Sequence, residues 1–216
     1  MKKLINDCFK SNIKKLIYIS TCSNYGVYKG NKKPTENSPL KPLSLYAKHK
    51  VEIEKFILKN KSNKSTKRII LRFATAFGVS PRMRFDLTIN QFVKEFFLKK
   101  KINVYDSLTW RPYCHVLDFA MAMEKVIRTS KIKDKSVFNV GSNQNNLTKI
   151  DILNKINQFI PNINYSIQKK ASPDKRDYNV NFNKIEKVLK FKTSFDCEYG
   201  IKEIINYIKK KIRLIN

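Results

Sequence analysis

The chain has 216 residues, 42% of them hydrophobic, which suffices for one substantial domain or two lobes and excludes a disordered chain. Its formal net charge of +28 raises nucleic acid, a membrane surface or an acidic substrate as candidate partners. The basic residues are mostly Lys and are spread along the whole chain, so we expect a solvated surface and no nucleic-acid partner.

The cysteines and the apolar runs further limit the class of protein. Cys8, Cys22, Cys114 and Cys197 form no CxxC motif and no ligand-like spacing with the two histidines, so neither a metal site nor a disulfide framework is expected. No run of 18 apolar residues is present, so no membrane span is expected. The first 16 residues lack the apolar core of a secretory signal, and the expected location is the cytoplasm.

The predicted elements of the first third form a βαβ unit. They are, in chain order, a short helix over 6–14, a buried strand over 15–20, a loop over 25–42, a helix over 44–58 and a strand over 68–73. Ser44 is a suitable N-cap for the longer helix. A strand, a crossover helix and a second strand predict a parallel sheet.

The rest of the chain continues as a mixture of helices and strands. We expect helices over 87–98, 116–128, 147–160, 182–189 and 199–212, and strands over 102–105, 137–140 and 163–167. The fold class is therefore α/β.

Two residues of the predicted helix 44–58 are candidates for proton transfer. Tyr46 and Lys50 are four positions apart, so they lie on one helix face. An ammonium beside a phenol favours its ionised form, which can exchange a proton with an alcohol. In a Lys-rich chain this spacing also arises on a solvated face, so the pair alone decides nothing.

A second candidate lies where the strand over 15–20 ends. Ser20 and Thr21 follow its apolar residues, and in open parallel sheets the reactive crevice lies at the carboxyl ends of the strands. A hydroxyl there can bond a substrate oxygen. It can equally satisfy the amides of the following loop.

Read together and in order, these segments resemble the extended short-chain dehydrogenase/reductase family, in its nucleotide-sugar epimerase/dehydratase branch. The stretches that carry the resemblance are "STCSNYG" (20–26), "SPLKPLSLYAKHK" (38–50), "RIILRFATAFG" (68–78), "WRPYCHVLDFAMA" (110–122), "FNVGS" (138–142) and "SPDKRDYNVNFNKI" (172–185). They span nearly the whole chain.

The resemblance implies a catalytic set of Thr21, Tyr46 and Lys50. Tyr46 would exchange a proton with a sugar hydroxyl while a hydride moves between the same carbon and a nicotinamide, and Thr21 would polarise the sugar oxygen. Tyr46 and Lys50 would also contact the cofactor, Lys50 at the nicotinamide ribose, and Phe73 would lie beside the nicotinamide. The implied cofactor is NAD or NADP.

The resemblance also implies substrate contacts. Arg111 and Arg176 match pyrophosphate-binding arginines, and forked guanidinium groups suit phosphate oxygens. Leu87 would lie at the nucleotide base. Thr75 would face the sugar, at a position where the family often has Asn. The implied partners are a nucleotide-sugar substrate and a second copy of the chain in a homodimer.

The sequence departs from the family pattern at the cofactor motif. Its five glycines, at 26, 30, 78, 141 and 200, cannot form the G-x-G-x-x-G loop that cradles a dinucleotide. We therefore expect a chain that begins about three βα units late, each of ~30 residues. The expected fold is an incomplete Rossmann-like parallel sheet plus a smaller mixed α/β substrate lobe. Residues 1–78 would belong to the cofactor domain, and 79–216 to the substrate lobe, with about 108–142 returning to the sheet.

A second departure concerns the reaction. The family's 4,6-dehydratases follow the catalytic Thr with Asp and Glu, where this chain has Cys22 and Ser23, so dehydration is disfavoured. The sequence predicts an NAD(P)-dependent nucleotide-sugar epimerase or keto-sugar reductase. A catalytically silent substrate lobe and a basic nucleic-acid-binding protein stay open as alternatives.

Overall fold

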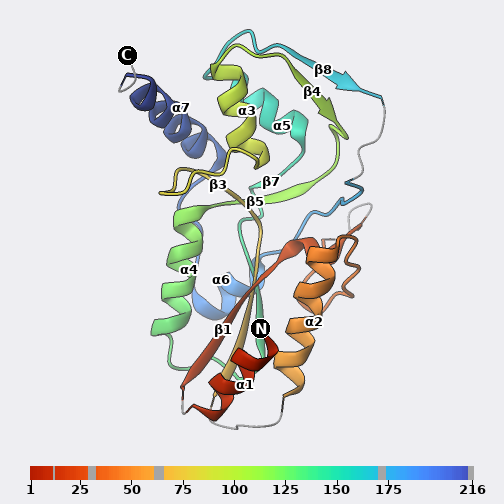
Figure 1. Ribbon diagram of the computed structural model, residues 1–216, viewed down its shortest axis with the longest axis vertical. Coiled ribbons are helices and arrows are strands. Elements are labelled where there is room, and N and C mark those ends of the chain that lie inside the picture. The colour runs from red at the N-terminus through yellow and green to blue at the C-terminus, as the bar shows by residue number, and fades with distance from the viewer. Residues whose placement is uncertain (12, 29–32, 61–65, 170–173, 214–216) are drawn as a thin grey trace.

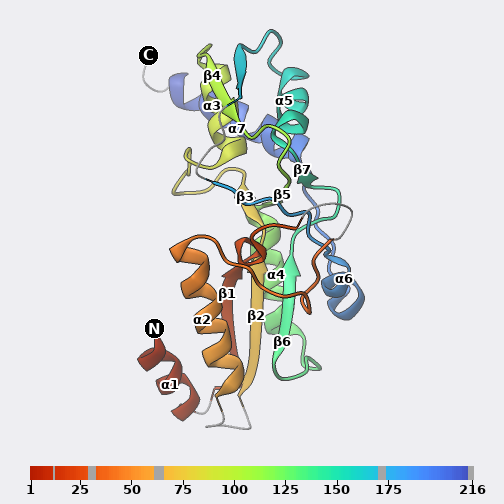
Figure 2. The ribbon, with the colours of Figure 1, turned by 90° about the vertical axis from the view of Figure 1, so that its right-hand side faces the viewer.

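The computed structural model describes all residues except 12, 29–32, 61–65, 170–173 and 214–216. Figures 1 and 2 show an elongated molecule with a three-stranded sheet towards one end and a smaller group of helices at the other. A second small sheet joins the two parts. Ser172 and Pro173, at the start of one of the family-like stretches, lie outside the described residues.

The larger sheet is parallel and has the strand order β1-β2-β6. Its strands are β1 (Lys15–Thr21), β2 (Lys67–Phe73) and β6 (Ser136–Val140). Apolar side chains alternate between its faces, since Ile69 and Leu71 enter one hydrophobic cluster and Ile70 enters another. This alternation explains why β2 is buried on both sides.

Helices cover both faces of this sheet. On one side lie α1 (Lys2–Lys10) and α2 (Leu45–Lys59), whose apolar residues pack on Ile70. On the other side, α4 (Val116–Arg128) and α6 (Asn183–Leu189) pack on Ile69 and Leu71. The crossover from β1 to β2 runs through α2, as expected of a βαβ unit.

The smaller lobe has its own core. Its helices are α3 (Thr88–Phe97), α5 (Lys149–Asn157) and α7 (Cys197–Arg213), which pack together around a single apolar cluster. Strands β4 (Ile102–Tyr105) and β8 (Tyr165–Gln168) form a parallel pair beside them. The joining sheet consists of β3 (Thr75–Phe77), β5 (Arg111–His115) and β7 (Asn146–Leu147).

The structure confirms the α/β fold and the parallel pairing of the first two predicted strands. The prediction of a helix over 147–160 was wrong at both ends. Thr148 caps α5 through a capping box with Asp151, so Leu147 stays outside the helix, and the helix ends at Asn157. The three strands of the joining sheet were missed because each is short and lacks a period-2 pattern.

Candidate active site

The tip of β1 turns sharply and presents Thr21. A short 3-10 helix, η1 (Cys22–Tyr25), follows, and the Thr21 hydroxyl oxygen accepts a hydrogen bond of 3.1 Å from the Ser23 amide. Gly26 ends this turn with φ 71°, and a Cβ atom there would lie 1.9 Å from the Lys41 carbonyl oxygen. Glycine is therefore required at this point, and it keeps the loop after Thr21 close to the residues before α2.

Helix α2 begins where the sequence predicted. Ser44 is the N-cap, with its hydroxyl oxygen accepting from the Ala47 amide at 3.2 Å. Tyr46 therefore lies in the first turn, and the residue is 56% exposed. Lys50 lies one turn further on, and its Nζ is 5.6 Å from the centre of the Tyr46 ring.

The Lys50 ammonium is held between α2 and β1. Its Nζ donates to the Ile19 carbonyl oxygen at 2.7 Å and lies 4.9 Å from the centre of the Tyr18 ring. Burial lowers the pKa of Lys50, and the Glu54 carboxylate opposes that shift. Burial, followed by the charges of Glu54 and Tyr46, raises the pKa of Tyr18 to about 12, so the Tyr18 hydroxyl stays protonated at neutral pH.

A cavity of about 620 Å³ opens at the carboxyl ends of β1 and β2, between the larger sheet and the smaller lobe. It brings together all the predicted site residues except Lys50: Thr21, Tyr46, Phe73, Thr75, Leu87, Arg111 and Arg176. Lys50 is not among the residues that line the cavity. The crevice is where an open parallel sheet is expected to bind its ligand.

The predicted residues are spread around this cavity. Thr21, Tyr46 and Phe73 come from the larger sheet and its helix, and the Phe73 ring stacks on Phe119 with the ring centres 4.0 Å apart. Thr75 is the first residue of β3, and Leu87 is the N-cap residue of α3. The cavity is therefore lined from both parts of the molecule.

Two arginines and one aspartate line the cavity close together. Arg111 lies at the start of β5, is largely buried, and has Nη2 3.3 Å from an Asp174 carboxylate oxygen. Arg176 donates to both carboxylate oxygens of Asp174, at 2.6 and 2.7 Å, and to the Ser23 hydroxyl at 2.9 Å. One carboxylate thus lies between two guanidinium groups.

The charges around Asp174 control its protonation. Burial alone would raise the pKa of Asp174, but the hydrogen bond from Arg176 and the charge of Arg111 hold it well below its usual range. Lys149, the first residue of α5, also lines the cavity and donates to the Tyr105 carbonyl oxygen. Burial and then the charge of Arg111 lower the pKa of Lys149.

Lys149, Asp174 and Tyr178 were missed as cavity residues. The Tyr178 hydroxyl is 3.2 Å from the Ser23 hydroxyl, and its ring lies under Arg111. Their positions depend on contacts between segments far apart in the sequence, so no local pattern indicated them. Asp174 and Tyr178 lie in the stretch 172–185 that carries the family resemblance, but that resemblance implied a role only for Arg176.

Cys22 and Ser23 stand where the dehydratases have an acid and a base. The Cys22 thiol is buried and donates to the Arg72 carbonyl oxygen, and burial raises its pKa, so it cannot serve as an acid near neutral pH. The Ser23 hydroxyl accepts a hydrogen bond from Arg176 and forms another with the Tyr178 hydroxyl. Neither side chain can take up the roles of the missing carboxyl groups.

His115 and Asp118 have structural roles and do not line the cavity. His115 is fully buried, its Nδ1 accepts from the Leu117 amide at the start of α4, and its Nε2 is 2.9 Å from Glu203. Asp118 accepts from the amides of Ser194 and Phe195.

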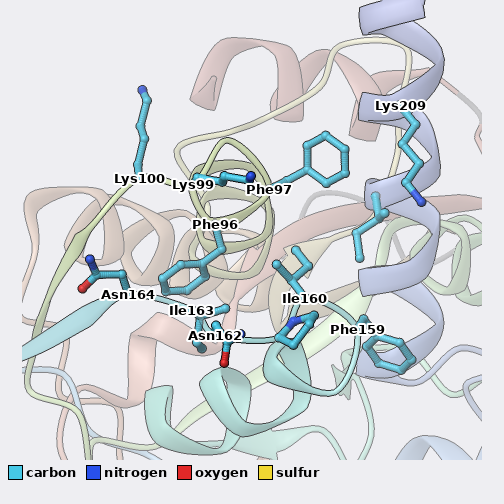
Figure 3. Close-up of a pocket in the computed structure, with 12 residues that line it drawn as sticks. Phe96, Phe97, Lys99, Lys100, Phe159, Ile160, Asn162, Ile163, Asn164 and Lys209 are labelled. Atoms are coloured by element: carbon cyan, nitrogen blue, oxygen red, sulfur yellow. The ribbon is translucent and has the colours of Figure 1, made fainter.

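A second cavity, of about 650 Å³, lies in the smaller lobe (Figure 3). Phe96, Phe159 and Ile160 line it together with the lysines Lys99 and Lys209. None of the predicted site residues borders this cavity. It is not part of the candidate active site.

A family model and curated relatives match this chain. Residues 1–141 match the model of the NAD dependent epimerase/dehydratase family, and the chain belongs to this family. A UDP-glucuronate 4-epimerase of Thermodesulfobacterium geofontis is 28% identical over 219 residues, covering 94% of this chain and 62% of the relative. An uncharacterized UDP-glucose epimerase of Bacillus subtilis is 28% identical over 142 residues, covering 65% of this chain and 43% of the relative.

Solved structures share the fold. UDP-glucuronic acid 4-epimerase from Bacillus cereus, in complex with UDP-glucuronic acid and NAD, superimposes with a TM-score of 0.84 at 23% identity. The match covers 97% of this chain and 66% of that one. MoeE5 in complex with UDP-glucuronic acid and NAD gives a TM-score of 0.83 at 19% identity, with 97% and 70% covered.

The chain is shorter than its curated relatives. It spans 43% of the Bacillus subtilis protein and 62% of the Thermodesulfobacterium protein. Over the described ranges, none of the helices has the length and apolar character needed to cross a membrane.

Proposed function

We propose that this chain carries the substrate site and the proton-transfer residues of an NAD(P)-dependent nucleotide-sugar epimerase or keto-sugar reductase. One observation carries the proposal. Thr21 and Tyr46 share a cavity with Arg111 and Arg176, so a hydroxyl-bearing sugar and a diphosphate can be bound next to each other.

In the proposed mechanism, the two arginines bind the diphosphate of the nucleotide sugar and direct its sugar towards the tip of β1. Tyr46 takes a proton from a sugar hydroxyl in the oxidative direction and returns it in the reductive direction. Thr21 donates a hydrogen bond to the same oxygen. The Lys50 ammonium, fixed by Ile19 and 5.6 Å from the Tyr46 ring, stabilises negative charge on the phenol oxygen.

The described residues fit one end of a nicotinamide cofactor. Tyr46, Lys50 and Phe73 would hold the nicotinamide and its ribose. The family's cofactor accepts and returns a hydride. The five glycines of this sequence do not form the G-x-G-x-x-G loop that would bind the cofactor pyrophosphate.

Epimerisation or keto-sugar reduction is favoured over dehydration. Elimination of water from a sugar needs an acid and a base beside the Tyr46 hydroxyl. The buried Cys22 thiol and the hydrogen-bonded Ser23 hydroxyl cannot supply them. This part of the proposal rests on the identity of two side chains.

A second function, a catalytically silent substrate lobe, is favoured by the glycine pattern alone. Such a lobe would bind the nucleotide sugar through Arg111 and Arg176 without turning it over.

We also propose that the protein is located in the cytoplasm and assembles as a homodimer. Sedimentation of the purified chain tests the latter.

One experiment separates these alternatives. The purified chain is incubated with NAD or NADP and with UDP-glucose, UDP-galactose or UDP-glucuronic acid, and the sugars are separated and identified by NMR. Interconversion of epimers at one carbon supports the enzyme. Saturable UDP binding by calorimetry without conversion supports the silent lobe, and the absence of both results rejects the proposed site.

A further inference from the structure

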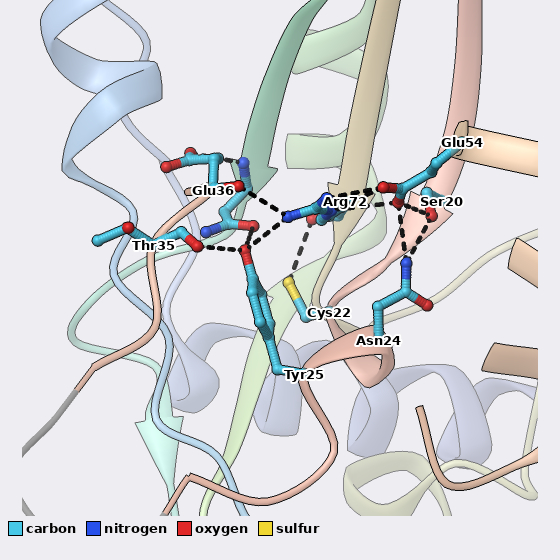
Figure 4. Close-up of polar contacts among 9 residues, drawn as sticks. Ser20, Cys22, Asn24, Tyr25, Thr35, Glu36, Glu54 and Arg72 are labelled. Carbon is cyan, nitrogen blue, oxygen red and sulfur yellow. Dashed lines mark hydrogen bonds and ion pairs between the residues drawn. The ribbon is translucent and has the colours of Figure 1, made fainter. Parts of the chain in front are cut away.

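A buried carboxylate connects the segments that form the candidate active site. Glu54 lies on α2, four residues after Lys50 and eight after Tyr46, so the three side chains follow one helix face. Its side chain is only 2% exposed. Figure 4 shows that it points towards Ser20 on β1 and Arg72 on β2.

The first connection runs to the tip of β1. One carboxylate oxygen of Glu54 accepts from the Ser20 hydroxyl and from the Asn24 side-chain amide, the latter at 2.8 Å. The Asn24 amide also donates to the Ser20 hydroxyl at 3.1 Å. Ser20 and Asn24 flank Thr21, so these bonds fix the turn that presents the Thr21 hydroxyl.

The second connection runs to the tip of β2. Arg72 donates from Nη2 to the other Glu54 oxygen at 2.7 Å and from Nε to both oxygens at 3.1 and 3.2 Å. It is the residue before Phe73, which lines the cavity. Its Nη1 also donates to the Tyr25 hydroxyl at 3.1 Å, and that hydroxyl is 2.7 Å from the Asn139 side-chain oxygen on β6.

We propose that Glu54 is a positioning residue, which fixes Tyr46 and Lys50 on α2 relative to Thr21 at the tip of β1. The reason is geometric, because this single carboxylate bonds groups on both sides of Thr21 and the residue before Phe73. A buried ion pair contributes little net stability compared with apolar side chains of the same volume, so the contacts favour one arrangement of the strands and helix. The reaction that this arrangement serves rests on the proposed function.

The charge of Glu54 also reaches Lys50. The charged and titratable groups that face the Lys50 ammonium are Tyr18 on β1 and Tyr46 and Glu54 on α2. Burial lowers the pKa of Lys50, and Glu54 is the group that opposes this. Without the carboxylate, the ammonium would lose its proton at a lower pH.

The test compares the wild-type chain with Glu54→Gln and with a matched control, Asp118→Asn. Asp118, like Glu54, is a buried acidic residue, and its carboxylate accepts hydrogen bonds from backbone amides. It lies on α4, on the other side of the sheet. Lys50 is titrated by NMR of ¹³Cε-labelled lysine, its signal being assigned by its loss in Lys50→Arg. Amide hydrogen exchange is measured for residues 22–25 and for β6.

The expected result is specific to Glu54→Gln. The Lys50 midpoint moves to lower pH, and exchange of the amides of residues 22–25 rises at least tenfold relative to β6, while Asp118→Asn changes neither. An unchanged Lys50 midpoint and unchanged relative exchange in Glu54→Gln would overturn the proposal. So would equal effects of the two variants, which would indicate a general loss of stability.

Two further measurements complete the test. If Glu54→Gln does not fold, the double variant Glu54→Met with Arg72→Met removes both buried charges, and the same localised increase in exchange is expected. If the wild-type chain turns over a UDP-sugar, Glu54→Gln should lower kcat at least tenfold with KM within about threefold, since alignment and not binding is lost. A wild-type chain without turnover contradicts the proposed function only, because titration and exchange still decide the role of Glu54.

Discussion

The guanidinium groups of Arg111 and Arg176 both contact the Asp174 carboxylate in the candidate site. We expect each of these two side chains to contribute to the binding of UDP. Arg111→Met should weaken UDP binding about tenfold or more, since hydrogen bonds to charged groups contribute about 1.5–3 kcal/mol. Calorimetric titration with UDP measures the effect. Arg128→Met, which removes an exposed arginine of α4, is the control and should leave the Kd unchanged.

Asp174→Asn should act in the opposite direction. Asp174 neutralises Arg111 and Arg176, so its carboxylate competes with a bound diphosphate for the same donors. Removal of this negative charge should tighten UDP binding about three- to tenfold at pH 7. Weaker UDP binding by Asp174→Asn would show instead that the carboxylate contacts the ligand or holds the arginines in place.

Some site residues could be read from the sequence and others could not. Helical spacing made Tyr46 and Lys50 candidates and a strand end made Thr21 one, but only the family resemblance combined them into a catalytic set. Glu54 continues the same four-residue spacing, so its place on the helix face was predictable, but its contact with Arg72 was not. Asp174 and Lys149 enter the cavity through long-range packing, which leaves no mark in a single sequence.

At the scale of the element, the start of α2 sets the position of Tyr46. Ser44→Ala removes the hydroxyl that caps the helix and should lower the free energy of unfolding by about 1 kcal/mol. Urea denaturation measures this loss. Ser44→Asp, which can also cap the helix, should retain the stability, and equal losses in the two variants would show that the cap does not stabilise α2.

The start of β2 is held by an ion pair that predicts a dependence on pH. The Arg68 side chain bonds both carboxylate oxygens of Asp134. The hydrogen bond from Arg68 lowers the pKa of Asp134 to about 2, although burial opposes this. An unfolded Asp titrates near 3.9, so the stabilisation is complete above about pH 5, falls through pH 4, and is lost as the pH drops through about 2.

Asp134→Asn should therefore destabilise the chain more at pH 7 than at pH 3. The loss at pH 7 should be about 1 kcal/mol, because the 37% exposed carboxylate is partly screened by solvent. Urea denaturation at both values gives the comparison. A loss of equal size at pH 7 and pH 3 would show that the charge of Asp134 contributes nothing.

Elements were predicted best where their pattern is strong. Residues 116–128 and 102–105 were predicted with the bounds that α4 and β4 have, because their apolar periodicity is complete. The joining strands β3, β5 and β7 are two to five residues long, and their pairing with one another decides their conformation. The sequence therefore indicated the sheet but not the strands that connect it to the smaller lobe.

At the scale of the whole molecule, the net charge of +28 should make stability depend on salt. Unscreened repulsion among the lysines opposes the compact state, so raising KCl from 10 to 500 mM at pH 7 should raise Tm by roughly 2–4 °C. Near pH 10, close to the sequence pI of 10.0, the salt effect should shrink. A Tm that falls with salt at pH 7 would show that ion pairs outweigh the repulsion.

The division of the chain at residue 78 stays a prediction at this scale. The structure shows that α4, which follows this point, packs on the larger sheet and that β6 is one of its three strands. The candidate site uses side chains from both halves, so we expect substrate binding to need both. Isolated residues 1–78 would then fail to bind UDP.

If Tyr46 moves the proton in a reaction on a nucleotide sugar, turnover depends on its hydroxyl. The most direct measurement is kcat for the interconversion of the UDP-sugar that the wild-type chain accepts, compared between Tyr46→Phe and Tyr199→Phe. Tyr199 is an exposed tyrosine of α7 outside the cavity lining. Tyr46→Phe should lower kcat by about 10²–10⁴-fold with Tyr199→Phe unchanged; equal kcat values in the two variants would contradict the account.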